Sequence, residues 1–369
     1  MSVLMHRSPI TEPLPEQTCT LCGTHSHLIA DHLSLCAACI RSWPREALPI
    51  ADEAHAAARR LFGLPKRPPR AEGGRRCGLC VQECVIGEGE RGYCGLRIVR
   101  DGKLRHLAGT PARGLLHWYR DPLPTNCVAD PVCAGHTQRG KHNLAVFYAA
   151  CTTDCLFCQN WNFRETDPVR STSLTATELA DAANPRTYCV CYFGGDPAAQ
   201  MPHALAASRI LAQRGVAVCW ETNGTVHPRL MKRALDLSLA TGGCVKFDLK
   251  AHDDNLHRAL TGASNHQTLE NFARAAARFD ERPNPPPLVA STLLVPGYVD
   301  AEEVGRIARF IADLNPAIPY ALLGFAPHFL FPDLPRTSVR HAEEAEAAAR
   351  AAGLRTVRIG NRHLLSRDY

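Results

Sequence analysis

The 369-residue chain contains no run of about 18 apolar residues, the length that a membrane-spanning helix needs. Its first seventeen residues, MSVLMHRSPITEPLPEQ, have neither an apolar core nor a cleavage site, so a secretory signal is not expected. The net charge is also small: 42 Lys and Arg residues against 36 Asp and Glu residues give +6. Neither a membrane protein nor a strongly basic nucleic-acid-binding protein is therefore indicated.

Cysteine, in contrast, is abundant, with seventeen residues in the chain. Without a secretory signal, this number predicts a reducing, cytoplasmic setting in which clustered thiols bind metal rather than form disulfides. Eleven of the cysteines stand in three close groups. The groups are Cys19, Cys22, Cys36 and Cys39; Cys77, Cys80, Cys84 and Cys94; and Cys151, Cys155 and Cys158.

The C-terminal two thirds of the chain alternate short apolar runs with amphipathic stretches. The runs predict strands over residues 144–150, 187–193, 216–222, 244–249, 288–295 and 320–326. The stretches between and after them predict helices over 175–184, 202–215, 227–242, 252–279, 301–315 and 341–353. Nearly continuous apolar strands separated by helices indicate an α/β fold with a parallel sheet. Six such units favour an open (β/α)6 partial barrel over a flat doubly wound sheet, although periodicity alone does not separate the two.

The composition divides the chain into four segments. We expect a zinc-ribbon-like module over 1–45, a helix and linker over 46–75, a cysteine-rich segment over 76–142 and the barrel over 143–369. The linker is predicted from KRPPRAEGGRR, which is rich in Pro, Gly and Arg.

Polar or glycine-containing segments follow the predicted strands in turn: CTTDCLFC, GGDP, ETNG, DLK, VPG and PHF. The carboxyl ends of parallel strands meet at one edge of a sheet or one mouth of a barrel. These segments therefore predict one shared site.

The loop after the first barrel strand contains the third cysteine group. Three thiolates within eight residues can hold three irons of a [4Fe–4S] cluster and leave the fourth iron open. An open metal position is typical of a reactive site. The alternative is a zinc site completed by a distant residue such as His142 or Cys127.

CTTDCLFC resembles the CxxxCxxC motif of the radical SAM superfamily, including an aromatic residue, Phe157, before the third cysteine. The resemblance implies that S-adenosylmethionine chelates the open iron through its amino and carboxylate groups. One electron, from a reductant such as flavodoxin or ferredoxin, would then cleave the cofactor. The product is a 5′-deoxyadenosyl radical that abstracts hydrogen from a substrate.

Three further segments resemble those of the glycyl-radical-enzyme activases in this superfamily. In FGGDP, backbone groups would meet the methionine amine, because a backbone without Cβ can approach a ligand closely. In ETNG and FDLK, an acidic residue, a Thr and an Asp would hold a monovalent cation, and the Lys would lie near the cofactor carboxylate. One departure is Glu221, where pyruvate formate-lyase activating enzyme has Asp. The cofactor-binding residues implied by these segments are Gly194, Gly195, Asp196, Glu221, Thr222, Asn223, Asp248 and Lys250. His328 in FAPHF, after the sixth strand, lines up with an activase histidine that contacts the cofactor.

The second cysteine group, in CxxCxxxCVIxxGxxGxCGxR, is similar to the N-terminal signature of the AmmeMemoRadiSam-system radical SAM proteins, relatives of the pyruvate formate-lyase activating enzymes. CVQEC stands here in place of the usual CPxxC. Four thiolates this close should bind zinc or a second cluster, and their spacing does not choose between the two. The resemblance implies a glycine of a partner enzyme as the substrate, and leaves radical modification of a peptide, cofactor or tRNA as alternatives.

The first cysteine group has the spacing CxxC-x13-CxxC, which is typical of tetrahedral zinc. About 40 residues cannot build a substantial core, so the metal is expected to hold this module together. Between its cysteine pairs stand His25, His27 and His32 and few basic residues, so protein docking or a structural role is expected rather than RNA binding.

Two interpretations stay open. Cys127 and Cys133, upstream of the barrel, would be packed thiols or ligands of an auxiliary cluster, and the first is favoured. A function of another class, a non-catalytic zinc-dependent interaction or nucleic-acid-binding protein, would require a degenerate barrel. The barrel motifs are intact, which favours the enzyme.

Overall fold

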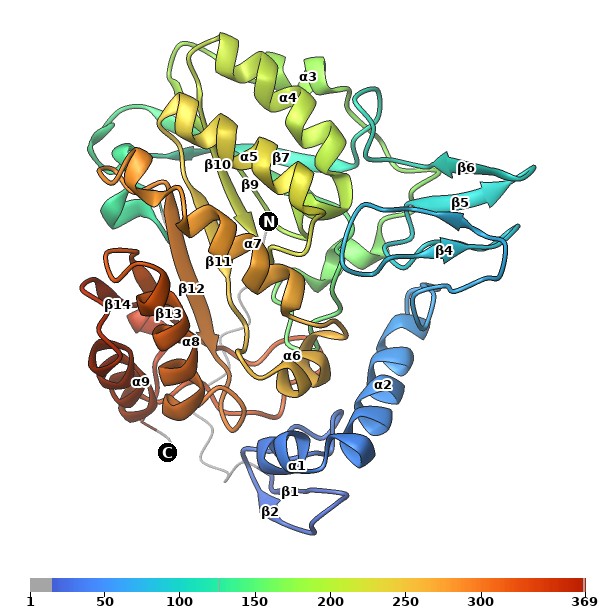
Figure 1. Cartoon of the computed structure of the whole chain (residues 1–369), viewed down its shortest axis with the longest axis vertical. Coiled ribbons are helices and arrows are strands. Elements are labelled where there is room, and N and C mark those ends of the chain that lie inside the picture. Colours follow the sequence, from blue (N-terminus) through green and yellow to red (C-terminus); the bar gives the residue numbers. More distant parts are fainter. Residues whose placement is uncertain (1–14, 126, 368) are drawn as a thin grey trace.

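The computed structural model describes residues 15–125, 127–367 and 369, so most of the segment on which the absence of a secretory signal was predicted lies outside it. At its centre is an eight-stranded sheet in the order β14-β13-β12-β11-β10-β9-β8-β7 (Figure 1). The strands are β7 Leu116–Pro122, β8 His142–Tyr148, β9 Thr187–Phe193, β10 Ala217–Thr222, β11 Val245–Asp248, β12 Leu288–Leu294, β13 Tyr320–Gly324 and β14 Val357–Gly360. Strands β8 to β14 run parallel, and β7 pairs antiparallel with β8.

The predicted α/β barrel fold is confirmed, and each of the six predicted strands is present within about two residues of its expected bounds. The sheet is wider than predicted because β7 and β14 extend its two edges. Strand β7, with the sequence LHWYRDP, alternates partly and fully exposed residues. An exposed edge strand of this kind lacks the apolar run by which the inner strands were found.

The helices that connect the strands lie against the outer face of the sheet (Figure 1). They are α3 Ala176–Asp181, α4 Met201–Gln213, α5 Pro228–Thr241, α6 Asp254–Thr261, α7 His266–Ala276, α8 Ala301–Leu314 and α9 Val339–Ala351. Side-chain caps begin several of them; the Asp300 carboxylate, for example, accepts a hydrogen bond from the Glu303 amide at the start of α8. Short 3-10 helices span Asp130–Val132, Ala134–Thr137, Trp161–Glu165, Pro197–Gln200, Phe279–Glu281 and Arg362–Leu364.

Alternation along the strands separates two faces of the sheet. Tyr192, Trp220 and Phe247 point outward into the main hydrophobic core, where the Trp220 indole donates to the Ala234 carbonyl of α5 at 3.1 Å. Their neighbours Glu221 and Lys246 face the inside of the barrel and line cavities there. The inner face therefore provides the functional groups.

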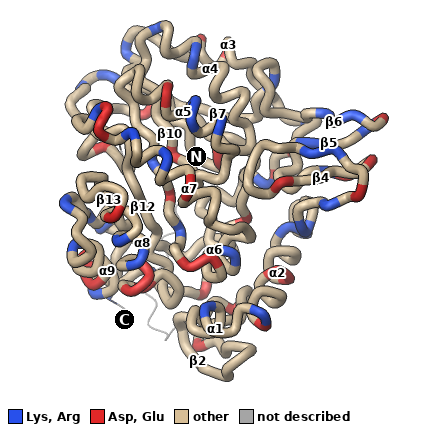
Figure 2. Tube along the Cα trace, viewed as in Figure 1, with Lys and Arg blue, Asp and Glu red and all other residues tan. Residues whose placement is uncertain are grey.

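Residues 15–106 lie beside the barrel (Figure 1). They contain β1 Gln17–Thr18, β2 His25–Ser26, α1 Ala37–Ser42, α2 Pro44–Arg60, β3 Arg75–Arg76, β4 Val85–Ile86, β5 Arg97–Arg100 and β6 Lys103–His106. Helix α2 connects the N-terminal module to the β3–β6 hairpins (Figure 1). Basic and acidic residues are interspersed along the trace, as expected from the small net charge (Figure 2). Among the described residues, none of the helices combines the length and apolarity that crossing a membrane requires.

Candidate active site

The loop CTTDCLFC leaves the carboxyl end of β8 through Ala150, whose φ of 83° lies in the left-handed region. The Thr153 hydroxyl lies 3.3 Å from Cys151 Sγ and 3.6 Å from Cys155 Sγ, so the loop folds back around its own thiols. These two cysteines and Cys158 line one cavity, together with residues that follow β9, β10 and β11. The structure therefore brings together segments that the sequence placed at the ends of four strands.

The glycine turn after β9 lies directly against the end of β8. Gly194 and Gly195 have φ values of 61° and 45°, and both line the cavity. A Cβ at Gly194 would overlap the Phe147 ring, and one at Gly195 would overlap the Tyr148 carbonyl oxygen. Only glycine fits at these two positions, which leaves the turn's backbone exposed to the cavity.

Asp196 connects this turn to the next strand rather than pointing into open space. Its buried carboxylate accepts hydrogen bonds from the Ala198 and Asn223 amides, both at 2.6 Å, and from the Thr222 hydroxyl at 3.2 Å. Burial raises the pKa of Asp196 to about 6, against these hydrogen bonds. The geometry thus gives Asp196 a positioning role.

Asn223 makes the corresponding connection to the cysteine loop. Its side-chain amide donates to the hydroxyls of Thr152 at 3.0 Å and Thr153 at 3.3 Å, and lies 3.7 Å from Cys151 Sγ. The side-chain Oδ1 of Asn223 accepts from the Thr225 hydroxyl at 2.7 Å. The ETNG segment therefore fixes the loop that contains the three thiols.

The remaining acidic residues of the cavity are each paired with a lysine. Glu221 Oε1 accepts from Lys246 Nζ at 2.7 Å, and Asp248 Oδ2 forms an ion pair with Lys250. Burial lowers the pKa of Lys250, but the adjacent Asp248 outweighs it and holds that pKa above its usual range. The other carboxylate oxygen of Asp248, Oδ1, is buried without a hydrogen-bond partner in the described part of the chain. The Asp248 residue itself lines the cavity.

Of two other predicted residues, Phe157 lines the cavity and His328 does not. Phe157 is buried, lines the cavity and lies 5.7 Å from the Lys250 ammonium, measured to the ring centroid. His328 is exposed, makes a 3.2 Å contact with the Ala326 carbonyl and is not among the residues that line the cavity. The structure therefore does not bring His328 to the other site residues.

A buried ion network behind the loop was missed from the sequence. Asp154, inside the cysteine motif, is fully buried and contacts His55 Nδ1 at 3.2 Å, Arg59 Nη1 at 3.5 Å and the Arg164 guanidinium at 3.2 Å. Despite burial, which raises it, these partners lower the pKa of Asp154 to about 2. The signal was an acidic residue between predicted cluster ligands, but two of its partners lie on α2, far away in the chain.

The second cysteine group lies next to the same loop. Its four members, Cys77, Cys80, Cys84 and Cys94, line one small cavity that Thr152 also borders. The Gln82 side chain donates to the Thr152 carbonyl at 2.8 Å. Burial raises the pKa of Cys84 to about 11.

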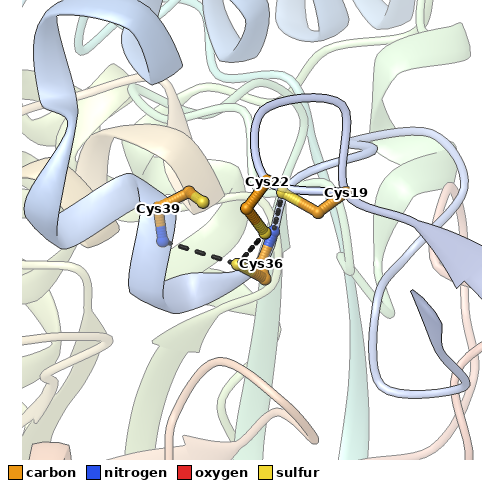
Figure 3. A group of neighbouring side chains, drawn as sticks. All are labelled: Cys19, Cys22, Cys36 and Cys39. Carbon is orange, nitrogen blue, oxygen red and sulfur yellow. Dashed lines mark hydrogen bonds between the residues drawn. The ribbon is translucent and has the colours of Figure 1, made fainter. Parts of the chain in front are cut away.

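The first cysteine group is compact (Figure 3). The sulfur atoms of Cys19, Cys22, Cys36 and Cys39 all lie within 4.8 Å of one another, and Cys22 and Cys36 are 3.9 Å apart. Cys36 caps α1, and its sulfur accepts from the Cys39 amide at 3.4 Å. A tetrahedral zinc ion with Zn–S bonds of about 2.3 Å needs sulfurs about 3.8 Å apart. These four thiols can hold a metal ion.

The residues around the barrel cavity fit an iron–sulfur cluster and S-adenosylmethionine. Three thiols line it from one loop, a glycine turn excludes side chains on one side, and the Asp248–Lys250 ion pair lines the same space. Soft thiolates suit iron–sulfur clusters, and mixed charges suit an amino acid carboxylate and amine. Which residues contact the cofactor stays a prediction.

Residues 145–311 match the family model described as the radical SAM superfamily. A protein of Methanocaldococcus jannaschii, named only as uncharacterized, is 27% identical over 304 residues, which cover 78% of this chain and 81% of that protein. The isethionate sulfite-lyase activating enzyme of Oleidesulfovibrio alaskensis is 35% identical over 135 residues, 36% of this chain and 41% of that enzyme. The pyruvate formate-lyase 1-activating enzyme of Escherichia coli is 28% identical over 192 residues, 48% of this chain and 74% of that enzyme.

Proposed function

We propose that this chain is a radical SAM enzyme, because residues 145–311 match the family model of that superfamily, and that it reductively cleaves S-adenosylmethionine to abstract hydrogen from a substrate. The observation that supports this proposal most directly is the shared cavity of Cys151, Cys155 and Cys158 with the glycine turn and the Asp248–Lys250 pair. When bound, a [4Fe–4S] cluster and S-adenosylmethionine would supply a 5′-deoxyadenosyl radical.

The chain's own residues have distinct roles in this proposal. The three cysteines would hold the cluster, and the backbone of Gly194 and Gly195 would receive the methionine amine. The Lys250 ammonium would offset the methionine carboxylate. Asp196 and Asn223 would keep these segments in place through the hydrogen bonds described above.

For the substrate, we propose a glycine of a partner protein, so that the enzyme acts as an activase. The relatives named activating enzymes support this choice, and a reductant such as flavodoxin or ferredoxin would be a second partner. Radical modification of a peptide, cofactor or tRNA is the alternative.

Free thiols throughout the described residues agree with a reducing, cytoplasmic setting.

The metal content is part of the proposal. Cys19, Cys22, Cys36 and Cys39 would bind zinc, as their compact arrangement suggests. The group from Cys77 to Cys94 would bind zinc or a second cluster. A monovalent cation beside Glu221 and Asp248 stays a prediction, since each of these carboxylates already faces a lysine.

The test compares two single variants of the anaerobically reconstituted full chain. Cys155→Ala should abolish formation of 5′-deoxyadenosine on addition of dithionite, whereas folded Cys36→Ala should retain measurable formation. Wild-type protein that contains only zinc and leaves S-adenosylmethionine intact would refute the proposal. Adding a glycyl radical enzyme and observing a glycyl radical by electron paramagnetic resonance would then separate the activase from the alternative.

A further inference from the structure

Six cysteines outside the sites described above converge inside the barrel. They line one cavity at the end opposite the three-cysteine loop, and come from the segment between β7 and β8, from β9 and β10, and from the position just before β11. These cysteines are Cys127, Cys133, Cys189, Cys191, Cys219 and Cys244. Together they are the barrel thiol group.

The sheet register aligns three of these thiols across neighbouring strands. Cys191 on β9 is the register partner of Cys219 on β10, and the pairing of Trp220 with Val245 places Cys244 beside Cys219. Adjacent strands are about 4.8 Å apart, and side chains at matching positions point to the same face. The strands therefore present a row of sulfur atoms to the barrel interior.

The segment between β7 and β8 adds sulfur from the other side of the cavity. Cys127 Sγ lies 2.8 Å from the ammonium of Lys246, which is also 3.0 Å from Cys191 Sγ. Lys246 is 1% exposed, and its one carboxylate partner is Glu221. A buried cation is thus in direct contact with two sulfurs of the group.

This arrangement is better suited to ligands of a metal centre than to packed thiols. Free buried cysteines ordinarily behave as small hydrophobic side chains and need no cation beside them. Thiolates bound to a cluster add negative charge, and a buried ammonium offsets such a charge. Lys246 also lines the cavity of the radical site, so the two cavities adjoin.

A free S–H bond is weaker than the C–H bonds of 5′-deoxyadenosine. A free thiol near the radical site would therefore quench the radical, whereas a thiolate bound to metal has no such hydrogen.

The spread of the sulfurs distinguishes a cluster from a single ion. Within the described ranges, the N-terminal Cys19–Cys39 group is the one set of cysteine, histidine and acidic side chains compact enough to surround one ion. The barrel thiol group is not gathered in that way, and a polynuclear cluster accepts ligands that lie farther apart.

We propose that thiols of this group, with Cys127 and Cys133 among the ligands, hold an iron–sulfur cluster in the barrel interior, adjacent to the radical site. Each thiol loses its proton to solvent when it binds iron, and ligation itself transfers no electron. The proposal depends on the barrel geometry, and it stands or falls independently of the substrate proposed above.

The experiment measures iron and acid-labile sulfide per chain after anaerobic reconstitution of the full-length protein. The starting variant carries Cys151→Ala, Cys155→Ala, Cys158→Ala, Cys77→Ala and Cys94→Ala, which removes ligands of the other two candidate clusters. We expect it to retain about two to four sulfides and the visible absorption of an iron–sulfur cluster. Adding Cys127→Ala and Cys133→Ala should remove both. Iron bound by the Cys19–Cys39 group would contribute no sulfide, so it would not be mistaken for a cluster.

The matched control is Val128→Ala with Val132→Ala, which removes similar volume from the same segment and should leave the sulfide unchanged. If the starting variant does not fold, Cys127→Ala with Cys133→Ala in the otherwise native chain gives the second measurement. That protein should lose one cluster's sulfide while its S-adenosylmethionine-dependent electron paramagnetic resonance signal remains. Unchanged sulfide in this folded variant, or a folded starting variant without sulfide, would overturn the proposal, whatever the result of the cleavage assay.

Discussion

At the scale of single residues, the predicted cluster ligands depend on a charge that lies between them. Asp154 has no solvent exposure and contacts two guanidinium groups and one imidazole. Two of these partners, His55 and Arg59, come from α2, so a helix outside the barrel determines the conformation of the loop. A buried carboxylate of this kind is costly to remove because its cationic partners remain.

We therefore expect Asp154→Asn to lower the free energy of unfolding by about 3–5 kcal/mol, since Arg59 and Arg164 would be left buried without an anion. Urea denaturation of the full chain at one defined metal content measures the change. The control is Asp181→Asn, which removes the surface pair with Arg214 and should change the stability by less than about 1 kcal/mol. Equal stabilities for the Asp154 and Asp181 variants would contradict the role of the network.

The buried His257 should make the stability of the protein depend on pH. His257 on α6 is buried, its Nδ1 lies 2.7 Å from the Ala263 carbonyl, and burial lowers its pKa from 6.5 to about 4. The unfolded chain therefore binds a proton at a higher pH than the folded chain. The contribution of His257 is complete above pH 6.5 and is lost as the pH falls from there to about 4, by about 3 kcal/mol in total.

Thermal unfolding between pH 7 and pH 5 should accordingly depend less steeply on pH in His257→Gln than in the wild type. The exposed His266→Gln on α7 should follow the wild-type slope. If the unfolding temperature of His257→Gln depended on pH as steeply as that of the wild type, burial of a neutral His257 would not be the cause of the pH dependence.

At the scale of elements, the loops after the strands determine the site more than the strands do. The turn after β9 is the clearest case, because its two glycines combine left-handed backbone with close approach to β8. Gly215, before β10, offers a comparison. It has a similar φ of 77°, but a Cβ there would meet nothing within 4 Å.

Gly195→Ala should weaken binding of S-adenosylmethionine at least about tenfold, which corresponds to 1.4 kcal/mol, because the turn must move away from Tyr148. Equilibrium dialysis with the reconstituted protein measures the affinity. Gly215→Ala has the same backbone strain, of about 1 kcal/mol, without the overlap, and should bind normally. Equal affinities in the two variants would show that the close approach is unimportant.

The same scale explains what could be predicted from the sequence. Strand β9 was located at Thr187–Phe193, its full extent, because parallel strands covered on both faces are nearly continuous apolar runs. That continuity also concealed the barrel thiol group. In TYCVCYF the cysteines count as apolar, so the inner and outer faces of the strand look alike. Only the register of three strands with the β7–β8 segment brings Cys191, Cys219 and Cys127 together, and such pairings depend on long-range geometry.

At the scale of the whole molecule, the N-terminal module is fastened to the barrel at the turn after β12. The Tyr298 hydroxyl accepts from the Ala30 amide and donates to the Leu35 carbonyl, both at 3.0 Å. Arg41 donates to Glu303 at 3.1 Å, and a Cβ at Gly297 would overlap the Leu28 carbonyl oxygen. The barrel therefore supports a module that, at about 40 residues, was expected to need metal to fold.

We expect Tyr298→Phe to loosen this attachment, because it leaves a buried amide and a buried carbonyl unpaired at a cost of about 1–3 kcal/mol. Limited proteolysis should cut within residues 15–60 faster, and a chelator should remove zinc sooner, while barrel fragments persist. The exposed Tyr119→Phe is the control and should match the wild type. Equal rates of proteolysis and zinc removal in both variants would show that the barrel does not support the module.

The residues of the ion network around Asp154 are synthesised in a definite order. Synthesis proceeds from the N-terminus, so α2, with His55 and Arg59, leaves the ribosome before the cysteine loop whose carboxylate it binds. The glycine turn, the ETNG segment and the Asp248–Lys250 pair follow only afterwards. The loop is therefore anchored in two stages, first by α2 and later by Asn223 of ETNG and by the Thr261 carbonyl that accepts from the Asp154 amide. A cluster donor that acts between the two stages would meet thiols attached on one side only.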